Sequence, residues 1–375
     1  MHRLEDKFIG IIGGAATSWQ ARSMRGLLWL LSKIYKAVIL ARLFCYRHRI
    51  FRQTIAGCPV ISVGNITVGG TGKTPVVEIL ARSLAKGGRK VAILSRGYKK
   101  KKKFVHHPKK AANIGLVSDG KVIFLDSKEA GDEPYMLARN LDGVRVLADK
   151  NRVRAGLFAI KELGADILLL DDGFQYLQLK KTHEILLVDA TTPFGFGHVL
   201  PRGLLREPLG EISRAQYIFL TKTEKVADIK PIREVLHQIA PKSEIFECVH
   251  DPKYLKNVFG QDEKPLDFIR GRKICALSAI AVPEGFEDTL LRLEAQTLKS
   301  FRFRDHHRFT RRELIEVIKE TRQLGVGTII TTEKDAVRIP EIHLEGIQIY
   351  YLRVEIKLVK GASDFYDFVH NICYY

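Results

Sequence analysis

The sequence predicts an α/β protein with a P-loop NTPase-like doubly wound parallel sheet and a second, smaller α/β domain. Continuous apolar runs of strand length alternate with helical stretches, which is typical of a parallel sheet covered by helices on both faces. A glycine-rich loop, GNITVGGTGKTP at residues 64–75, follows one such run and precedes a helical stretch. The apolar content of 46% over 375 residues is enough for two cores.

The chain carries a formal net charge of +19, which predicts an anionic partner or working surface. Nucleic acid, membrane headgroups and phosphorylated substrates all have that chemistry. The sequence contains neither an aromatic and basic repeat nor a series of helicase-like motifs, so we expect no nucleic-acid partner. The five cysteines include no Cys-x-x-Cys pair, which indicates reduced thiols in a cytosolic setting, without a disulfide framework or a zinc site.

Residues 1–52 are predicted to form a membrane-interface helix region that belongs to the first domain. The stretch 27–44 is strongly apolar, but Lys33, Lys36 and Arg42 interrupt it, so it makes a poor membrane span. At helical spacing its apolar residues share one face, two of its lysines lie opposite, and arginines flank the segment, as in a helix lying in a bilayer interface. A core helix packed on its own domain is the alternative that this pattern leaves open.

Residues 53–245 are predicted to form the P-loop domain. Gly72, Lys73 and Thr74 fit the second half of the strict P-loop, whereas Thr67 stands where its first glycine is expected. In such a loop the backbone N–H groups wrap phosphates, the lysine reaches the β- and γ-oxygens, and the threonine holds Mg²⁺. A glycine-rich turn that enters an ordinary helix is the alternative. The residues expected around the phosphates are Thr67, Gly69, Gly70, Thr71, Gly72, Lys73 and Thr74.

Polar residues follow the other strand-like runs of this domain. In a doubly wound sheet the carboxyl ends of the strands form the ligand site. The run ILLLDD at residues 167–172 resembles a Walker B strand, in which a carboxylate at the strand end helps to hold Mg²⁺. An Asp before Gly that serves only the turn is the alternative. The polar residues at these strand ends are Arg96, Asp149, Asp171, Asp172, Asp189 and Lys222.

Two further stretches of this domain contain charged candidates. GDEP, at residues 131–134, precedes a helical run, and its spacing alone favours a capping role for Asp132 and Glu133. LPRGLLREP, at residues 200–208, is a proline-bounded loop whose arginines could clamp a phosphate.

Residues 246–375 are predicted to form the smaller domain, because the pattern weakens and polar residues increase before a second α/β series begins. The final helical stretch, 361–375, could pack back on the first domain. The sequence FRDHHRF at residues 303–309 places His306 and His307 side by side, so they point to opposite faces of a strand. A single histidine acting with a distant carboxylate is therefore easier to build than a metal site, and a solvated turn is the alternative.

Taken in order, seven stretches of the chain resemble the tetraacyldisaccharide 4′-kinase family, the lipid A kinases of bacterial membranes. They are SVGNITVGGTGKTP, SRGY, GDEP, DDGFQ, LPRGLLREP, DHH and TTEKDAVR, and they extend from residue 62 to residue 338. The departure at Thr67 is shared with the usual loop of that family. The run Lys99–Lys103 does not match the family pattern, and its role stays open.

The resemblance implies an ATP-dependent kinase that transfers the γ-phosphoryl group to the 4′-hydroxyl of tetraacyldisaccharide 1-phosphate in lipid A biosynthesis. It implies ATP and Mg²⁺ as cofactors, and the lipid disaccharide 1-phosphate and an anionic membrane surface as partners. Peripheral attachment at the cytoplasmic face of the inner membrane follows, and no obligatory protein partner is expected. The alternative is a membrane-associated P-loop NTPase switch, which turns over nucleotide without a lipid acceptor. No guanine-reading motif is visible, but the sequence does not exclude GTP.

The same resemblance implies roles for individual residues. Asp132 would activate the sugar hydroxyl, with His306 as its partner and His307 as the alternative, while Lys73 would contact the transferred phosphate. The three residues implied at the Mg²⁺ ion are Thr74, Asp171 and Asp172. The five residues implied in the surrounding phosphate and substrate network are Arg96, Tyr98, Glu133, Arg206 and Glu207.

Overall fold

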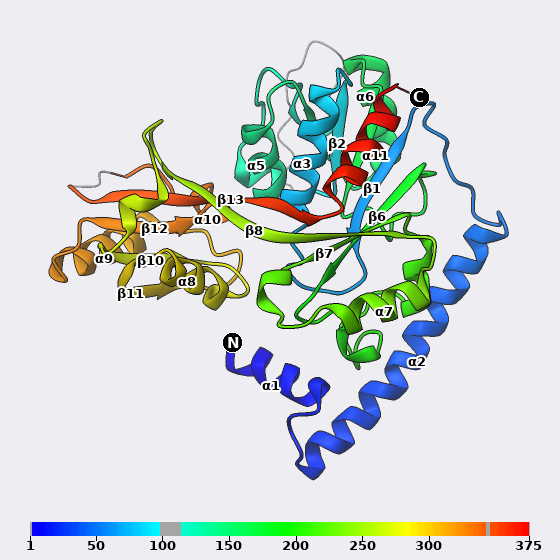
Figure 1. The fold of residues 1–375 in the computed structure, drawn as a ribbon, viewed down its shortest axis with the longest axis horizontal. Helices are drawn as coiled ribbons and strands as arrows, with labels where there is room; N and C mark the ends of the chain where they lie inside the picture. The colour runs from blue at the N-terminus through cyan, green and yellow to red at the C-terminus, as the bar shows by residue number, and fades with distance from the viewer. Residues whose placement is uncertain (1, 98–113, 343–345, 375) are drawn as a thin grey trace.

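The computed structural model describes residues 2–97, 114–342 and 346–374, and its central feature is one long sheet (Figure 1). The strands are β1 (Val60–Asn65), β2 (Val91–Ser95), β3 (Leu116–Ser118), β4 (Arg145–Ala148), β5 (Ile167–Asp171), β6 (His183–Asp189), β7 (Tyr217–Thr221), β8 (Glu244–Asn257), β9 (Glu263–Lys264), β10 (Lys273–Ser278), β11 (Gln296–Arg302), β12 (Thr328–Thr332) and β13 (Gln348–Lys360). They lie in the order β11-β10-β12-β13-β8-β7-β6-β1-β5-β2-β4-β3, and β9 pairs with β8.

Helices cover both faces of this sheet. The α-helices are α1 (His2–Gly13), α2 (Trp19–Arg47), α3 (Lys73–Lys86), α4 (Ser127–Ala130), α5 (Asp132–Asn140), α6 (Arg152–Leu163), α7 (Lys230–Ile239), α8 (Pro283–Arg292), α9 (Arg311–Gln323), α10 (Glu333–Ala336) and α11 (Ala362–Tyr374). Short 3₁₀ helices are η1 (Gly195–Gly197), η2 (Leu209–Arg214), η3 (Thr223–Lys225) and η4 (Leu266–Ile269). The predicted fold class is confirmed.

The larger lobe is built around β1, which pairs in parallel with β5 on one side and β6 on the other. Strands β1 and β5 are buried along their whole length because both of their faces are covered. Helices α3, α5 and α11 pack in one hydrophobic core, α7 packs in a second and α6 in a third. Because β1, β5 and β2 are neighbouring parallel strands, their carboxyl ends meet at one edge of the sheet.

The smaller lobe is the segment between β8 and β13, which contains β9 to β12 and α8 to α10 (Figure 1). Its strands β11, β10, β12 and β13 are paired in parallel. The long strands β8 and β13 run antiparallel and connect this series to the parallel strand β7 of the larger lobe. Residue 246, where the smaller domain was expected to begin, lies within β8, and the two series share one mixed sheet.

The C-terminal helix α11 returns to the larger lobe after β13. Phe365, Phe368 and Val369 are buried in the same core as the P-loop helix α3. The side chain of Arg89, just after α3, donates to the carbonyl oxygen of Cys373 at 3.3 Å. The chain therefore leaves the larger lobe through one strand and comes back to it through the neighbouring one.

A buried arginine on β13 connects the two lobes. The guanidinium of Arg353 is ion-paired with Glu78 of α3, and its Nη1 lies 2.9 Å from a carboxylate oxygen of Glu333 of α10. The side-chain amide of Asn140, at the end of α5, donates to the same Glu333 carboxylate at 2.7 Å. These contacts link the P-loop helix, the helix that begins at Asp132, and the smaller lobe.

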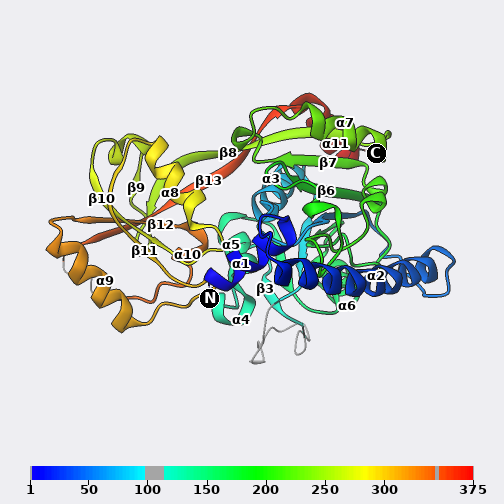
Figure 2. The same cartoon turned by 90° about the horizontal axis from the view of Figure 1, so that it is seen from below.

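Helix α2 runs along the outside of the larger lobe (Figure 2). It packs through a few residues such as Leu28 and Leu43, which are buried, whereas Leu27, Ile34 and Val38 are 55%, 58% and 61% exposed. The apolar face that the sequence predicts for this helix is therefore turned away from the protein, contrary to the core-helix alternative. In the described part of the chain, none of the helices combines the length and the apolar character of a membrane span.

Candidate active site

A cavity of about 1100 Å³ opens at the edge where β1, β2 and β5 end. Its walls come from α2, the P-loop, the start of α5, the start of α6, the loop at residues 200–206 and the loop at residues 306–308 of the smaller lobe. Lys73, Asp132, Asp171 and His306 all line it. The fold thus brings together residues from both lobes that are far apart in the sequence, such as Lys73 and His306, which are separated by 233 positions.

The P-loop of residues 64–74 connects β1 to α3 in a strand–loop–helix unit. Gly72 has a φ of 79°, a conformation that glycine adopts without steric cost, and it lets α3 begin directly at Lys73. The Nζ atom of Lys73 lies 3.4 Å from Oδ1 of Asn65 and 3.6 Å from Oδ1 of Asp172. The free N–H groups and the positive dipole at the start of α3 make this end of the helix suitable for phosphate.

The first half of the P-loop is held by its own asparagine and by the loop at residues 200–208. The side-chain amide of Asn65 donates to the carbonyl oxygen of the buried Thr67 at 2.6 Å. The N–H of Val68 donates to the carbonyl oxygen of Leu204 at 2.8 Å. These bonds fix the loop at the position where the strict motif has a glycine.

The second half of the P-loop is attached to the ends of β6 and β7. Lys222, directly after β7, donates to the carbonyl oxygen of Gly70 at 2.8 Å and also pairs with Asp189. The hydroxyl of Thr221 donates to the carbonyl oxygen of Thr71 at 3.0 Å. Two of the strand-end residues that the sequence singles out, Asp189 and Lys222, thus shape the P-loop.

Asp171, the last residue of β5, carries an unsatisfied carboxylate oxygen. Its Oδ2 accepts a hydrogen bond from the Ser95 hydroxyl at 3.1 Å, whereas its buried Oδ1 has no hydrogen-bond partner within the described chain. Burial raises the pKa of Asp171, and the charge of Glu133 raises it further, although Lys73 acts in the opposite direction. A cation beside Oδ1 would supply the missing partner.

Asp172 follows in the left-handed conformation, with a φ of 52°. Its carboxylate lies 2.9 Å from Nη1 of Arg206 and 3.6 Å from Nζ of Lys73. Burial alone would raise the pKa of Asp172, but the charges of Lys73 and Arg206 outweigh it and lower that pKa. The carbonyl oxygen of Asp172 also accepts a hydrogen bond from the buried Arg152 at 3.1 Å, so this turn is held by two arginines.

The groups around Asp171 fit a Mg²⁺ ion that is bound mainly through phosphate and water. Within residues 2–97, 114–342 and 346–374, no group of three His, Cys, Asp or Glu side chains is arranged to hold a metal ion. Magnesium in nucleotide sites commonly takes one or two protein ligands and completes its shell from phosphates and waters. The unpartnered Oδ1 of Asp171, close to the P-loop lysine, agrees with such a donor set.

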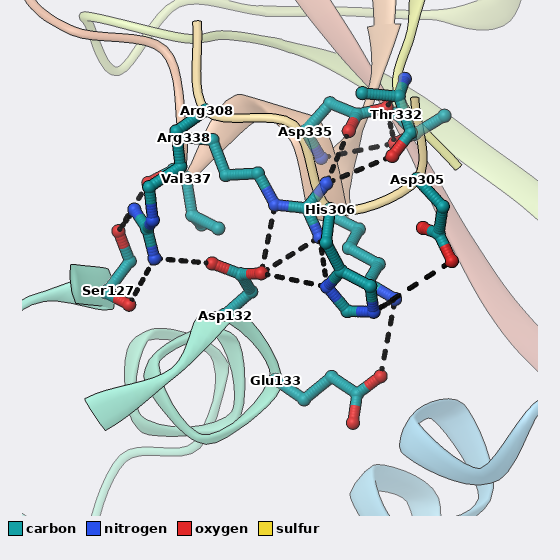
Figure 3. Close-up of polar contacts among 12 residues, drawn as sticks. Ser127, Asp132, Glu133, Asp305, His306, Arg308, Thr332, Asp335, Val337 and Arg338 are labelled. Carbon is teal, nitrogen blue, oxygen red and sulfur yellow. Dashed lines mark hydrogen bonds and ion pairs between the residues drawn. The ribbon is translucent and has the colours of Figure 1, made fainter. Parts of the chain in front are cut away.

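Asp132 lies at the centre of a cluster that joins the two lobes (Figure 3). Its Oδ1 lies 2.9 Å from Nη2 of Arg308, and its Oδ2 accepts a hydrogen bond from Nε of Arg338 at 2.9 Å. Nδ1 of His306 lies 3.4 Å from Oδ2. Gly131, rather than Asp132, is at the N-cap position of α5, and no side chain caps this helix, so the capping role that spacing favours is not what the structure shows.

The charge of Asp132 is stabilised by its neighbours. Burial acts to raise the pKa of Asp132, but the proximity of His306 and Arg338 and the positive charges of Arg338 and Arg308 lower it to about 2. A carboxyl group with that pKa is ionised at neutral pH and is a weak base. In this arrangement it is suited to accept a hydrogen bond from a hydroxyl group.

The two neighbouring histidines have different surroundings. His306 has a φ of 61° and points toward Asp132, whereas His307 pairs with Glu313 at 3.0 Å and stacks on Phe303. Glu313 also forms a capping box with Thr310 at the start of α9, which fixes the end of this loop. Of the two histidines, His306 is the one that the fold brings to Asp132.

The remaining predicted site residues do not all line the cavity. Arg96 and Glu133 line the cavity, and a carboxylate oxygen of Glu133 lies 3.4 Å from Nζ of Lys334. Glu207 does not line it; this residue is buried, with its carboxylate 2.8 Å from Nη2 of Arg214. Tyr98 and the run Lys99–Lys103 lie outside the described residues.

The sequence did not predict Arg308 and Arg338, which contact Asp132, or Arg152, which donates to the carbonyl oxygen of Asp172. Arg308 follows the two histidines directly, and Arg338 ends the stretch TTEKDAVR, so both lie in or beside segments that were already noted. Arg152 begins α6 after the cap residue Asn151, whose side chain accepts a hydrogen bond from the N–H of Arg154 at 3.0 Å. A basic residue at the edge of a motif was the only available signal.

The fold and this site define a P-loop nucleotide-binding enzyme. Residues 24–373 match the family model of tetraacyldisaccharide-1-phosphate 4′-kinases, LpxK. The tetraacyldisaccharide 4′-kinase of Halothermothrix orenii is 34% identical over 378 residues, with 96% of each chain covered. That of Anaeromyxobacter dehalogenans is 38% identical over 333 residues, with 88% of this chain and 85% of that one covered.

A solved structure agrees with this similarity. The crystal structure of LpxK from Aquifex aeolicus in complex with ATP superposes with a TM-score of 0.74 and is 30% identical, covering 94% of this chain and all of that one. The chain therefore belongs to the tetraacyldisaccharide 4′-kinase family, as its motifs predict, and it is a kinase.

Proposed function

We propose that the protein transfers the γ-phosphoryl group of ATP to the 4′-hydroxyl of tetraacyldisaccharide 1-phosphate in lipid A biosynthesis. The observation that carries this proposal is one cavity that is lined by both the P-loop lysine, Lys73, and the ionised carboxylate of Asp132. The names of the family members and the ATP complex of the A. aeolicus relative support it.

On the nucleotide side, the P-loop N–H groups and the start of α3 bind the phosphates of ATP. Lys73 contacts oxygens of the β- and γ-phosphates, between which the P–O bond breaks, and Arg206 adds positive charge at the cavity wall. Thr74, Asp171 and Asp172 would hold Mg²⁺ directly or through water. When bound, this ion supplies neutralisation of the charge that develops on the phosphates.

On the acceptor side, Asp132 orients the sugar hydroxyl and accepts its proton. Phosphoryl transfer passes through a loose transition state, so the hydroxyl proton is released late and a strong base is not required. His306 assists from the smaller lobe, and Arg96 and Glu133 are placed to contact the substrate at the cavity wall. Because His306 and Asp132 belong to different lobes, the acceptor site is complete only when the lobes are closed.

Helix α2 attaches the protein peripherally to the anionic cytoplasmic face of the inner membrane. Its exposed apolar residues face away from the fold, while the hydroxyl of Tyr35 on the same helix donates to the carbonyl oxygen of Arg206 at 3.0 Å. Tyr35 and Ile39 also line the cavity. The helix that would lie in the bilayer interface is therefore a wall of the site in which a lipid headgroup must be bound.

Charged substitutions on the exposed face of α2 should weaken vesicle binding without unfolding the protein. Ile34→Glu combined with Val38→Glu places two carboxylates where an interfacial helix contacts acyl chains. We expect less flotation with vesicles that contain anionic phospholipid, and weaker binding of the unchanged protein at high salt. Ile315→Glu, at a 57% exposed position of α9 in the smaller lobe, is the control. Equal flotation of both variants would place the lipid contact elsewhere.

The proposed activity is tested by incubating the pure protein with labelled ATP, Mg²⁺ and the disaccharide 1-phosphate lipid in mixed micelles. A bisphosphorylated lipid that carries the label is the expected product. Nucleotide hydrolysis that is independent of the lipid would contradict the kinase assignment and favour a nucleotide-controlled switch. Unlabelled GTP in excess measures how strongly the base is selected.

A further inference from the structure

Arg338 belongs to the cluster around Asp132, and each of its three guanidinium nitrogens has a polar partner. It follows α10, its side chain is 0% exposed, and it belongs to the stretch TTEKDAVR. Its Nη1 donates to the carbonyl oxygen of Ala279 and to Oδ1 of Asp335, both at 3.0 Å. These two bonds fix the guanidinium within the smaller lobe.

The other nitrogens of this guanidinium face the two residues of the proposed acceptor site (Figure 3). Nε donates to Oδ2 of Asp132 at 2.9 Å, and Nη2 lies 2.8 Å from the same oxygen. Nη2 also lies 3.1 Å from Nδ1 of His306. Arg338 is therefore closer to both Asp132 and His306 than these two residues are to each other, since Nδ1 and Oδ2 are 3.4 Å apart.

The chemistry of arginine determines the direction of the contact with His306. A guanidinium carries only N–H donors and stays protonated in proteins, so Nδ1 of His306 must accept the hydrogen bond. A neutral histidine that accepts at Nδ1 carries its proton on Nε2. An Asp–His pair in which Nδ1–H donates to the carboxylate would need Arg338 to give up its contact with Nδ1.

We propose that Arg338 is a positioning residue for phosphoryl transfer, which holds His306 as the Nε2–H tautomer and orients the ionised Asp132. This inference rests on the proposed kinase function, in which Asp132 receives the acceptor hydroxyl. The smaller lobe thus contributes a rigid arginine in addition to a histidine, and Asp132 is oriented only when the lobe is closed over the cavity.

Cations and carboxylates face both ring nitrogens of His306. Arg338 lies at Nδ1, and Lys334 of α10 lies 3.5 Å from Nε2. The carboxylates are Asp132 at Nδ1 and Asp305, which is 3.9 Å from Nε2, while Glu133 is paired with Lys334. At each ring nitrogen the cation is closer than the carboxylate, but Arg338 at Nδ1, 3.1 Å, is closer than Lys334 at Nε2, 3.5 Å, so Nδ1 is the better acceptor and the proton is placed on Nε2.

The first test compares the kinetics of Arg338→Met with those of Arg338→Lys. We expect Arg338→Met to lower kcat by about 10²-fold with little change in the KM for ATP, because a small misplacement of a catalytic group has an effect of that size. Its kcat/KM should also begin to fall at a higher pH, because the loss of a neighbouring cation raises the pKa of Asp132. Arg338→Lys retains a charge and should recover the pH profile but only part of kcat.

Arg353→Lys is the matched control, since Arg353 is also a buried arginine that pairs with carboxylates between the lobes. It should lower the melting temperature while the shape of the pH profile stays that of the unchanged protein. A pH profile for Arg338→Met that begins to fall at the same pH as the unchanged one would overturn the positioning role and leave a structural one.

The second test does not depend on activity. ¹⁵N NMR of histidine-labelled protein, with the His306 signal assigned by its loss in His306→Gln, should report the Nε2–H tautomer at neutral pH. An Nδ1–H tautomer would overturn the inference even if the lipid is phosphorylated. If the Nε2–H tautomer is found but no lipid is phosphorylated, the proposed substrate is wrong and the geometry of the cluster stands.

Discussion

Asp132→Asn should lower kcat by about 10²- to 10⁴-fold while the affinity for ATP changes little. Asn has nearly the same shape as Asp but cannot accept a proton at neutral pH, and it cannot hold the charge that faces Arg308 and Arg338. The loss should appear in kcat because the contact with the acceptor hydroxyl strengthens as the phosphoryl group arrives. Steady-state kinetics with the lipid acceptor measure this effect.

The stability of the same variant can be measured separately. Asp132 has a pKa of about 2 in the folded protein against an ordinary value of 3.8, so its ionised form stabilises the fold by about 2 kcal/mol above pH 4. That contribution is lost in the unchanged protein as the pH falls from 4 toward 2. Urea unfolding at pH 7 should therefore show Asp132→Asn to be less stable by this amount, and kinetics should be recorded well below its melting temperature.

Variants of the two neighbouring histidines provide a second test and a control for this prediction. His306→Ala should lower kcat in the same direction, and the double variant should be far less impaired than the product of the two single effects, because residues that act as a unit are not additive. His307→Ala should have a smaller effect on kcat, since His307 contacts Glu313. An Asp132→Asn enzyme with normal kcat would end the catalytic interpretation.

Lys73→Ala should lower kcat by about 10²- to 10³-fold in a protein that remains folded. Lys73 lies 3.6 Å from the carboxylate of Asp172 and lines the same cavity as Asp132. Its removal takes away a preorganised positive charge that would stabilise the transferred phosphate. Lys86→Ala is the control, because this exposed lysine is at the opposite end of the same helix. Unchanged turnover in Lys73→Ala, with a normal melting curve, would contradict the assignment of the phosphate loop.

Much of the fold could be predicted because its signals are local. The apolar runs at residues 167–171 and 183–189 are strands, and the loop at residues 64–74 joins a strand to a helix as expected. Local patterns cannot report that β8 and β13 pair in antiparallel register, since more than a hundred residues separate their starts. The sequence therefore predicted two α/β series but not the shared sheet.

The site shows the same limit. The candidates that lie in motifs, such as Lys73 and Asp171, are placed at the cavity by the strand–loop–helix unit around them. The contacts of Asp132 with Arg308 and Arg338 span 176 and 206 positions and depend on how the lobes meet. Glu207 shows the converse case, in which a residue next to the site in the sequence does not take part in it. It follows the cavity-lining Arg206, but its buried carboxylate pairs with Arg214.

The strands β8 and β13 also have an evolutionary consequence. The whole smaller lobe enters and leaves the larger lobe through this one pair of neighbouring strands, and α11 then completes the core beside α3. A segment whose two ends are adjacent can be inserted into a host domain without disturbing the host's own core. His306, Arg308 and Arg338 all lie on this segment, whereas the phosphate loop does not. A single insertion would therefore be sufficient to add the groups around Asp132 to a P-loop domain.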